Sequence, residues 1–238
     1  EYNPIECVNT NIQGAENIVA AALDCNVRHV IGLSTDKAAN PVNLYGASKL
    51  AADKIFIAAN NLVGNRHTRF AVVRYGNVLG SRGSVVPLFR RLIEEGADFL
   101  PITDSRMTRF WITLPQGVEF VLSCLESMEG GEIFVPKIPS MKVTELVAAM
   151  APDLATRSIG IRPGEKLHEI LVTRDEARTT YELTDRYIVA PAFSFWQREY
   201  GAPEGATLVE EDFEYTSNAN PDWLTGSELN DLLQTTTV

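Results

Sequence analysis

The sequence has few of the residues that bind metals or form disulfides. Its 238 residues include three cysteines and three histidines, and neither set shows a paired or metal-ligand spacing. We therefore expect no metal site and a reducing compartment, the cytoplasm. The cysteines are expected to be small packed side chains; they are Cys7, Cys25 and Cys124.

Long apolar runs and a positive charge balance are also missing. No apolar run approaches the ~18 residues that read as a membrane-spanning helix, and no charged-then-apolar signal opens the chain. The formal net charge is −10, whereas a nucleic-acid-binding domain carries a basic surface. We expect no membrane segment and no nucleic-acid partner, and an anionic ligand must be bound by local arginines and lysines.

A glycine-rich turn between a first strand and a first helix is absent as well. The chain begins at Glu1 and runs directly into an amphipathic helix predicted over 4–24, with Pro4 in its first turn. A dinucleotide-binding sheet carries such a turn in its first unit. We therefore expect the amino-terminal part of the protein to be missing here, and the chain alone to be inactive and to hold a dinucleotide weakly.

Strand and helix patterns alternate along the chain, which predicts an α/β fold with a doubly wound parallel sheet, Rossmann-like but without its amino-terminal strands. Residues 1–80 are expected to form the carboxy-terminal half of the dinucleotide-binding domain. Residues 81–238 are expected to form mainly a smaller substrate-binding region, with segments returning to the main sheet. The predicted strands are 28–35, 70–80, 98–103 and 132–136, and the helices predicted after 4–24 are one that follows the turn at Asn40-Pro41 and those at 85–95, 114–128 and 228–233. The helix after Asn40-Pro41 is expected to have an apolar face of Ala47, Ala51, Ile55, Ala58 and Leu62.

One stretch places an alcohol, a carboxylate, an amine and a phenol where a strand passes into a helix. The strand ends in Ser34-Thr35-Asp36-Lys37, and the helix begins with Tyr45-Gly46-Ala47-Ser48-Lys49. Tyr45 and Lys49 are four residues apart and share one helix face. An ammonium beside a phenol lowers the phenol's pKa, so Tyr45 is a candidate general base.

Several motifs together resemble the inverting UDP-N-acetylglucosamine 4,6-dehydratases, extended short-chain dehydrogenase/reductases that start pseudaminic acid synthesis. Residues 34–41 read STDKAANP and residues 43–49 read NLYGASK. Residues 74–84 read RYGNVLGSRGS, residues 107–110 read MTRF, and residues 162–166 read RPGEK. The resemblance covers nearly the whole chain and implies an NADP-dependent hydro-lyase of polysaccharide biosynthesis, whose sugar is expected to serve flagellin glycosylation.

The resemblance implies a role for each residue of this stretch. The sugar is oxidised at C4 by bound NADP, water is eliminated across C5 and C6, and the hydride returns to C6. Tyr45, helped by Thr35 and Lys49, takes the C4 hydroxyl proton. Asp36 protonates the departing C6 hydroxyl, and Lys37 is the base at C5. Retaining dehydratases carry glutamate where Lys37 stands, so lysine favours inversion at C5 and the β-L-arabino 4-keto product.

The resemblance also implies two sets of binding residues and a homo-oligomer. The cofactor set is Ser34, Tyr45, Lys49, Tyr75, Gly76, Asn77 and Val78. The set for the UDP-sugar is Lys37, Asn77, Thr108, Arg162 and Glu165, of which the last four hold the UDP part. Arginine suits a pyrophosphate because its planar fork donates two hydrogen bonds at once.

Three other functions stay open. A UDP-sugar C4 epimerase needs the phenol but has no need of the Asp36-Lys37 pair. A dehydratase/C5-epimerase of capsule synthesis has a similar sequence and is a second alternative. A related group of larger, membrane-attached dehydratases tends to carry methionine at the Tyr45 position, so Tyr45 favours the smaller soluble type. A non-catalytic dinucleotide-binding module would be free to lose one of the five catalytic residues, and none is lost.

Overall fold

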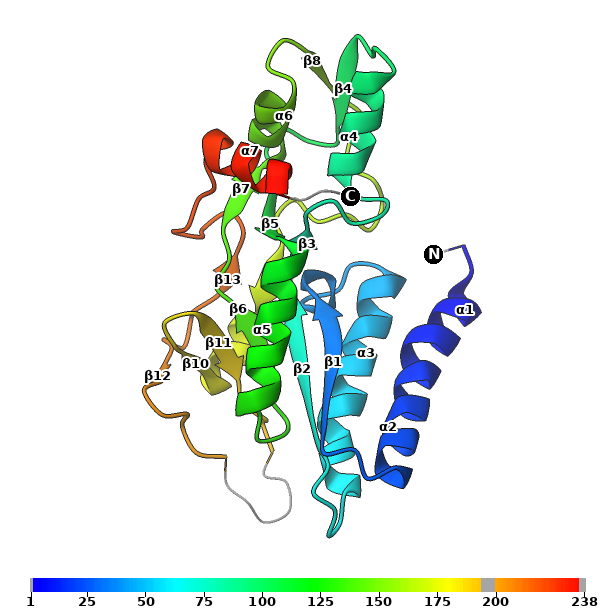
Figure 1. Ribbon diagram of the computed structural model, residues 1–238, viewed down its shortest axis with the longest axis vertical. Helices are drawn as coiled ribbons and strands as arrows, with labels where there is room; N and C mark the ends of the chain where they lie inside the picture. Colours follow the sequence, from blue (N-terminus) through cyan, green and yellow to red (C-terminus); the bar gives the residue numbers. More distant parts are fainter. Residues whose placement is uncertain (1, 194–199, 236–238) are drawn as a thin grey trace. The chain divides into compact units, whose positions relative to one another are not determined.

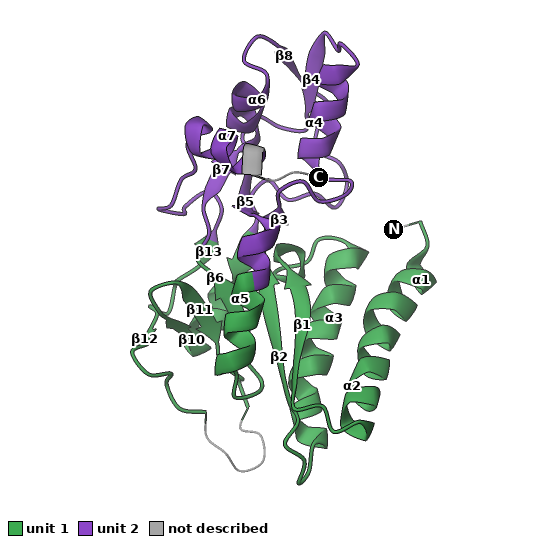
Figure 2. Ribbon diagram, viewed as in Figure 1, with its two compact units in different colours: residues 1–75, 119–137, 170–215 green, residues 76–118, 138–169, 216–238 purple. Residues whose placement is uncertain are grey.

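The computed structural model describes residues 2–193 and 200–235, and they divide into two compact units. Unit 1 contains residues 1–75, 119–137 and 170–215, and unit 2 contains residues 76–118, 138–169 and 216–238. Figure 2 shows the two units in different colours. Both are discontinuous in sequence, because the segments 119–137 and 170–215 return to the unit of the first 75 residues. The predicted assignment of cofactor and substrate functions to these parts stays a prediction.

Unit 1 is built on a six-stranded sheet, seen in Figure 1. Its strands lie in the order β1 (His29–Thr35), β2 (Arg69–Tyr75), β6 (Ile133–Pro136), β11 (Arg186–Val189), β10 (Thr180–Glu182) and β12 (Thr207–Leu208). β1, β2 and β6 are parallel, as the sequence predicts, whereas each later pair is antiparallel. Thr35 and Tyr75 are register partners, so both strands end at the same edge.

Helices cover both faces of this sheet. Residues 4–24 are helical as predicted, in three parts: α1 (Pro4–Val8), the π-helical η1 (Asn9–Gln13) and α2 (Gly14–Asp24). α3 (Leu44–Ala59) lies on one face, where Phe56 is so close to Gly32 that a β-carbon there would clash with the ring. α5 (Leu114–Ser127) covers the other face, because its Cys124 shares an apolar cluster with Ala71, Val73 and Phe134. Successive strand residues alternate between these two helices.

The apolar face predicted for α3 is wrong. Ala47, Ala58 and Leu62 are exposed, and the buried positions are Gly46, Ser48, Ala52, Asp53, Phe56 and Ala59. Three of these six residues are not apolar, so the buried face is rotated by about one residue from the one that the hydrophobic period indicates. The cysteine prediction is also only partly right, since Cys124 is buried but Cys25 is exposed.

Unit 2 consists of two small sheets and three helices around its own core. One sheet has the order β3 (Asn77–Val78), β5 (Thr108–Ile112) and β7 (Ser140–Lys142), and the other pairs β4 (Phe99–Ile102) with β8 (Ala155–Ser158). The helices are α4 (Val85–Glu94), α6 (Val143–Met150) and α7 (Gly226–Thr235). Their core includes Phe89, Leu100, Trp111, Leu146 and Leu229. Short elements connect the rest of the chain: η2 (Asp36–Ala38), η3 (Asn60–Leu62), β9 (Ile170–Val172), η4 (Arg174–Thr179) and β13 (Tyr215–Thr216).

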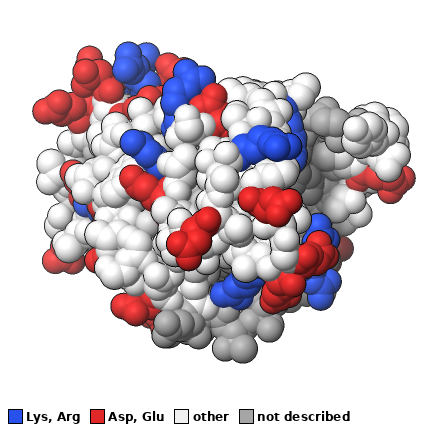
Figure 3. All heavy atoms as spheres, turned by 90° about the horizontal axis from the view of Figure 1, so that it is seen from above, with Lys and Arg blue, Asp and Glu red and all other residues white. Residues whose placement is uncertain are grey.

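Charged side chains of both signs are mixed on the molecular surface. Figure 3 shows lysines and arginines interspersed with aspartates and glutamates on the face that it draws. Among the described residues, no helix is both long and apolar enough to cross a bilayer.

Candidate active site

The end of β1 brings three of the predicted catalytic side chains into direct contact. Thr35 has an extended backbone and caps the short η2, with its hydroxyl accepting from the backbone N–H of Lys37. Asp36 is fully buried. Its Oδ1 accepts one hydrogen bond from Thr35 Oγ1 at 2.8 Å and another from Lys37 Nζ at 2.9 Å. The carboxylate and the ammonium therefore form a hydrogen-bonded ion pair, which the hydroxyl also touches.

Tyr45 is held beside this ion pair by the start of α3. Asn43 caps the helix, its Oδ1 accepting from the backbone N–H of Gly46 at 2.7 Å. A β-carbon at Gly46 would collide with the carbonyl oxygen of Lys37 and touch Pro41. Only glycine lets the first turn of α3 approach η2 this closely, which explains why a glycine follows the tyrosine.

The pKa of the Tyr45 phenol is raised from its ordinary value, in contrast to the sequence prediction. Partial burial is the main cause; the charge of Lys37 acts to lower the pKa, and that of Asp36 acts to raise it. Lys49, expected to lower the phenol's pKa, instead donates from Nζ to the backbone carbonyl of Leu33 at 2.6 Å. Sequence spacing places the two side chains on one face, but it does not fix where a flexible lysine points.

Ser34 and Tyr75, two predicted cofactor residues, also lie at this edge of unit 1. Ser34 is buried and donates to Asp53 Oδ2 at 2.8 Å. Burial raises the pKa of the Tyr75 phenol, and so does the nearby Tyr45, so the two phenols are neighbours. Seven predicted site residues therefore come from unit 1: Ser34, Thr35, Asp36, Lys37, Tyr45, Lys49 and Tyr75.

Sequence reasoning missed a buried charge network directly behind these residues. Arg74 is fully buried between the carboxylates of Asp53 and Glu176. The signal was present in the sequence, because one arginine interrupts the apolar strand Phe70–Tyr75 and one aspartate lies in the middle of α3. A buried charge is rare unless it is paired, so each of these positions called for a partner.

The remaining predicted residues belong to unit 2, where Gly76, Asn77 and Val78 begin the small sheet. A β-carbon at Gly76 would lie 2.5 Å from the Cβ of Phe110, so the backbone passes too close for any other residue. Asn77 and Val78 pair with Trp111 and Ile112 of β5. Both are partly exposed.

Thr108 lies inside unit 2 and is already hydrogen-bonded there. Its hydroxyl is 2.8 Å from Nδ1 of His168 and 2.7 Å from the hydroxyl of Ser217, and the residue is buried. Burial and the charges of Arg109 and Arg106 lower the pKa of His168, so the imidazole is neutral at neutral pH. Thr108 would therefore contribute to a ligand site from a fixed position.

Arg162 and Glu165 are on the loop between β8 and β9. Gly160 and Gly164 adopt φ values of 86° and 83°, which glycine tolerates best. Arg162 Nη1 is 3.8 Å from Glu165 Oε1, and 64% of the Arg162 side chain is exposed. A loose surface ion pair of this kind contributes little to stability. The guanidinium fork is therefore accessible to a ligand.

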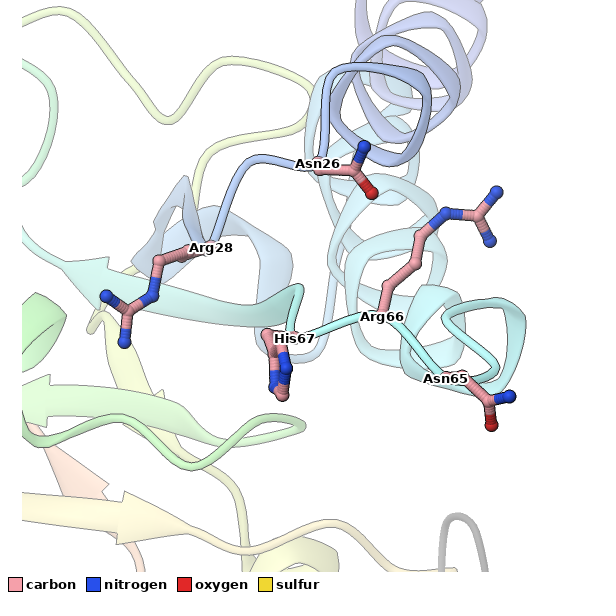
Figure 4. Close-up of a pocket in the computed structure, with 5 residues that line it drawn as sticks. All are labelled: Asn26, Arg28, Asn65, Arg66 and His67. Atoms are coloured by element: carbon pink, nitrogen blue, oxygen red, sulfur yellow. The ribbon is translucent and has the colours of Figure 1, made fainter.

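A hollow of about 800 Å³ also lies at the other end of the parallel strands of unit 1, near the starts of β1 and β2. It is lined by Asn26, Arg28, Asn65, Arg66 and His67. Figure 4 shows that the side chains of Arg28, His67, Asn65 and Arg66 extend in different directions, and all five lining residues are exposed. They do not converge on a common ligand position, so the reactive groups at the other ends of the strands form the better candidate site. No group of three or more potential metal ligands occurs among the residues that the structure describes.

Comparisons with known proteins agree on one family. Residues 1–191 match the family described as "Polysaccharide biosynthesis protein". The chain is 55% identical over 241 residues to the inverting UDP-N-acetylglucosamine 4,6-dehydratase of Campylobacter jejuni, an alignment that covers 99% of this chain and 72% of that protein.

The chain is also similar to solved structures. Pen from Bacillus thuringiensis superposes with a TM-score of 0.87 at 35% identity, covering 99% of this chain and 71% of that one. DesIV, a dTDP-glucose 4,6-dehydratase from Streptomyces venezuelae solved with NAD, gives a TM-score of 0.60 at 23% identity, covering 67% and 56%. The latter likeness supports the Rossmann-like fold.

Proposed function

Because the chain belongs to the polysaccharide biosynthesis protein family, together with the inverting UDP-N-acetylglucosamine 4,6-dehydratases, we propose that it catalyses the C5-inverting 4,6-dehydration of UDP-N-acetylglucosamine. The observation that carries the proposal is the Asp36–Lys37 pair beside Tyr45. Dehydration needs an acid for the departing hydroxyl and a base for the C5 proton, whereas a C4 epimerase or a binding module needs neither.

The ion pair can supply both groups through one proton transfer. At rest, Lys37 carries the proton and Asp36 the negative charge, and neither is in its working form. Nζ and Oδ1 are 2.9 Å apart in a hydrogen bond, so moving one proton across it yields a neutral amine and a carboxylic acid. Lys37 can then take the C5 proton while Asp36 protonates the C6 hydroxyl as it leaves, and the total charge of the pair is unchanged.

Tyr45 has the first role in the proposed sequence. Its phenolate form takes the proton of the C4 hydroxyl during oxidation and becomes the neutral phenol, and the resulting C4 ketone makes the C5 proton acidic. Lys37 assists here too, because its charge acts against the burial that raises the pKa of Tyr45. Thr35 holds Asp36 through the 2.8 Å hydrogen bond between Oγ1 and Oδ1.

A nicotinamide dinucleotide fits the donor set of unit 1. Lysine has three N–H donors, and Lys49 uses one for the carbonyl of Leu33, which leaves donors for the ribose hydroxyls. Tyr45 is 44% exposed at the same helix start. Bound there, the nicotinamide would accept the hydride from C4 and return it to C6. Ser34 and Tyr75 would line the same end of the cofactor. The family resemblance adds Gly76, Asn77 and Val78 to the cofactor set.

The finer assignments rest on the family resemblance. We propose NADP rather than NAD, UDP recognition by Asn77, Thr108, Arg162 and Glu165, a homo-oligomer and a place in the cytoplasm. The product would serve pseudaminic acid synthesis and flagellin glycosylation. Titration of the full-length protein with NADP and with NAD tests the cofactor preference.

The proposed function is tested by turnover of UDP-N-acetylglucosamine in heavy water by the full-length protein. We expect deuterium at C5 and the L-arabino 4-keto-6-deoxy sugar, identified by its proton couplings in NMR, since the base at C5 exchanges with solvent. Lys37→Ala should stall after oxidation, with the near-ultraviolet absorbance of reduced nicotinamide retained. Lys142→Ala, at an exposed position in unit 2, is the control and should turn over normally. A D-xylo product from the wild-type protein would refute the proposal.

A further inference from the structure

A buried arginine joins three elements of unit 1 behind the candidate active site. Arg74 donates from Nη1 to Glu176 Oε2 at 3.0 Å and from Nη2 to Glu176 Oε1 at 3.1 Å, a bidentate pair. Nη1 also donates to the carbonyl of Leu171 at 3.0 Å, and Nη2 is 3.7 Å from Asp53 Oδ2. The side chain of Arg74 is fully buried. Its position is therefore fixed from several sides at once.

Three residues of this network, Ser34, Arg74 and Asp53, lie next to residues of the candidate site. Ser34, which donates to Asp53, is the register partner of Arg74 and directly precedes Thr35. Arg74 itself directly precedes Tyr75. Asp53 is four residues after Lys49, on the same face of α3, and the charge of Lys49 acts on the pKa of Asp53. A shift of the guanidinium would be transmitted to β1, β2 and α3 together.

Stability alone does not explain a network of this kind. Removing three charged groups from water is costly, and replacing a buried ion pair by uncharged residues of similar size is often neutral or even stabilising. Burial acts to raise the pKa of Glu176, but the charge and hydrogen bonds of Arg74 outweigh it and lower that pKa. For Asp53 burial prevails and its pKa is raised, although Arg74 acts to lower it. Arg74 therefore offsets the cost of burial for the Glu176 carboxylate, its bidentate partner, but not for the Asp53 carboxylate.

We propose that Arg74 is a positioning residue of the active site, which holds the end of β1 against α3 so that Thr35, Lys49 and Tyr45 keep their catalytic geometry. The inference rests on the proposed function, because it assigns the network to the dehydration that those residues carry out. It predicts that disrupting the network lowers kcat and leaves the affinity for UDP unchanged, because the proposed UDP-binding residues Arg162 and Glu165 belong to the other unit.

The test compares variants of the full-length holoenzyme that differ in geometry but remain folded. The triple variant Arg74→Met, Asp53→Asn, Glu176→Gln removes all three charges and keeps oxygen acceptors for Ser34 and Thr173. We expect it to bind UDP with wild-type affinity and to lose about 10²-fold in kcat, the usual effect of an ångström of misplacement. Arg74→Lys keeps the charge but not the planar fork, and an intermediate loss of kcat is expected.

Arg186→Met is the matched control. Arg186 is another largely buried arginine of the same sheet, paired with Asp185 and donating to Ser123, but it contacts none of the candidate catalytic residues. Its replacement should lower the melting temperature and leave kcat unchanged. A triple variant with wild-type kcat, or one that loses UDP affinity in proportion to kcat, would overturn the positioning role. If the wild-type protein itself shows no dehydration, it is the proposed function that fails.

Discussion

At the scale of single residues, burial and neighbouring charges determine how readily the Tyr45 phenol can act as a base. Thr35, Asp36 and Lys37 are in contact as their adjacency at a strand end suggested. The spacing of Tyr45 and Lys49 led to a prediction of a lowered phenol pKa, and the structure gives a raised one. A pKa depends on burial and on side-chain direction in three dimensions, neither of which a one-dimensional spacing contains.

Tyr45→Phe should remove turnover and preserve UDP binding. The phenolate oxygen is needed to accept the C4 proton, and proton transfer by a positioned group contributes about 10²–10⁴-fold, so a loss of that size in kcat is expected. Calorimetric titration with UDP should give the wild-type affinity. Because a general base acts in its deprotonated form and the pKa of Tyr45 is raised, wild-type kcat/KM should increase with pH above neutrality. Tyr181→Phe in β10 is the control, and a Tyr45→Phe enzyme with wild-type kcat would contradict the assignment.

Gly46→Ala should destabilise the protein through a steric clash at the active site. The added β-carbon would overlap the carbonyl oxygen of Lys37, and overpacking of this kind costs about 1–3 kcal/mol. Urea unfolding of wild-type and variant proteins measures the difference. Gly14→Ala in α2 is the matched control, because its β-carbon would meet nothing closer than 3.7 Å and a helical alanine is better by about 0.5–1 kcal/mol. Equal effects of the two substitutions would exclude the clash.

At the scale of elements, the periodic helices and the strands up to residue 136 were mostly predictable, whereas most short elements after residue 139 were not. The helices at 4–24, 85–95 and 114–128 were predicted within one residue of the observed limits. The short strands predicted at 98–103 and 132–136 are observed as β4 and β6. β5, α6 and the strands after residue 139 were not predicted, because short segments without a continuous apolar run carry too little pattern. The buried face of α3 was misassigned because Gly46, Ser48 and Asp53 are buried there through a close approach and hydrogen bonds, which hydrophobicity does not register.

The link between β2 and η4 should make stability depend on pH. The pKa of Glu176 is lowered in the folded state from its ordinary value of 4.5, so its ionised form stabilises the fold. This contribution is fully present above about pH 4.5 and is lost as the pH falls through the lower, folded-state pKa. The stability difference between wild type and Glu176→Gln should therefore be largest near neutral pH and shrink in acid. Urea unfolding across this pH range measures it, and a difference that does not vary with pH would contradict the assigned shift.

At the scale of the whole molecule, the candidate functions are distributed over two units that the sequence order does not separate. The predicted boundary at residue 80 lies near the first passage between units at 75–76, but the chain passes between them again at 118–119, 137–138, 169–170 and 215–216. Sequence patterns locate elements and not their packing, so only the possibility of returning segments was predictable. The proposed chemistry belongs to unit 1, and Arg162 and Glu165 belong to unit 2.

This division predicts that catalysis and UDP binding can be impaired independently. Arg162→Ala in the full-length protein should weaken UDP binding by about tenfold to a hundredfold, since a hydrogen bond to a charged group contributes about 1.5–3 kcal/mol, while kcat at saturating substrate is retained. Tyr45→Phe should do the reverse. The two side chains share no described partner, and effects at independent sites add within about 0.3–0.5 kcal/mol. The double variant should therefore bind UDP as Arg162→Ala does and show the kcat of Tyr45→Phe. Calorimetry and steady-state kinetics on the wild type, the two single variants and the double variant complete a double-mutant cycle. A coupling free energy well above about 0.3–0.5 kcal/mol would contradict the independence of the two residues.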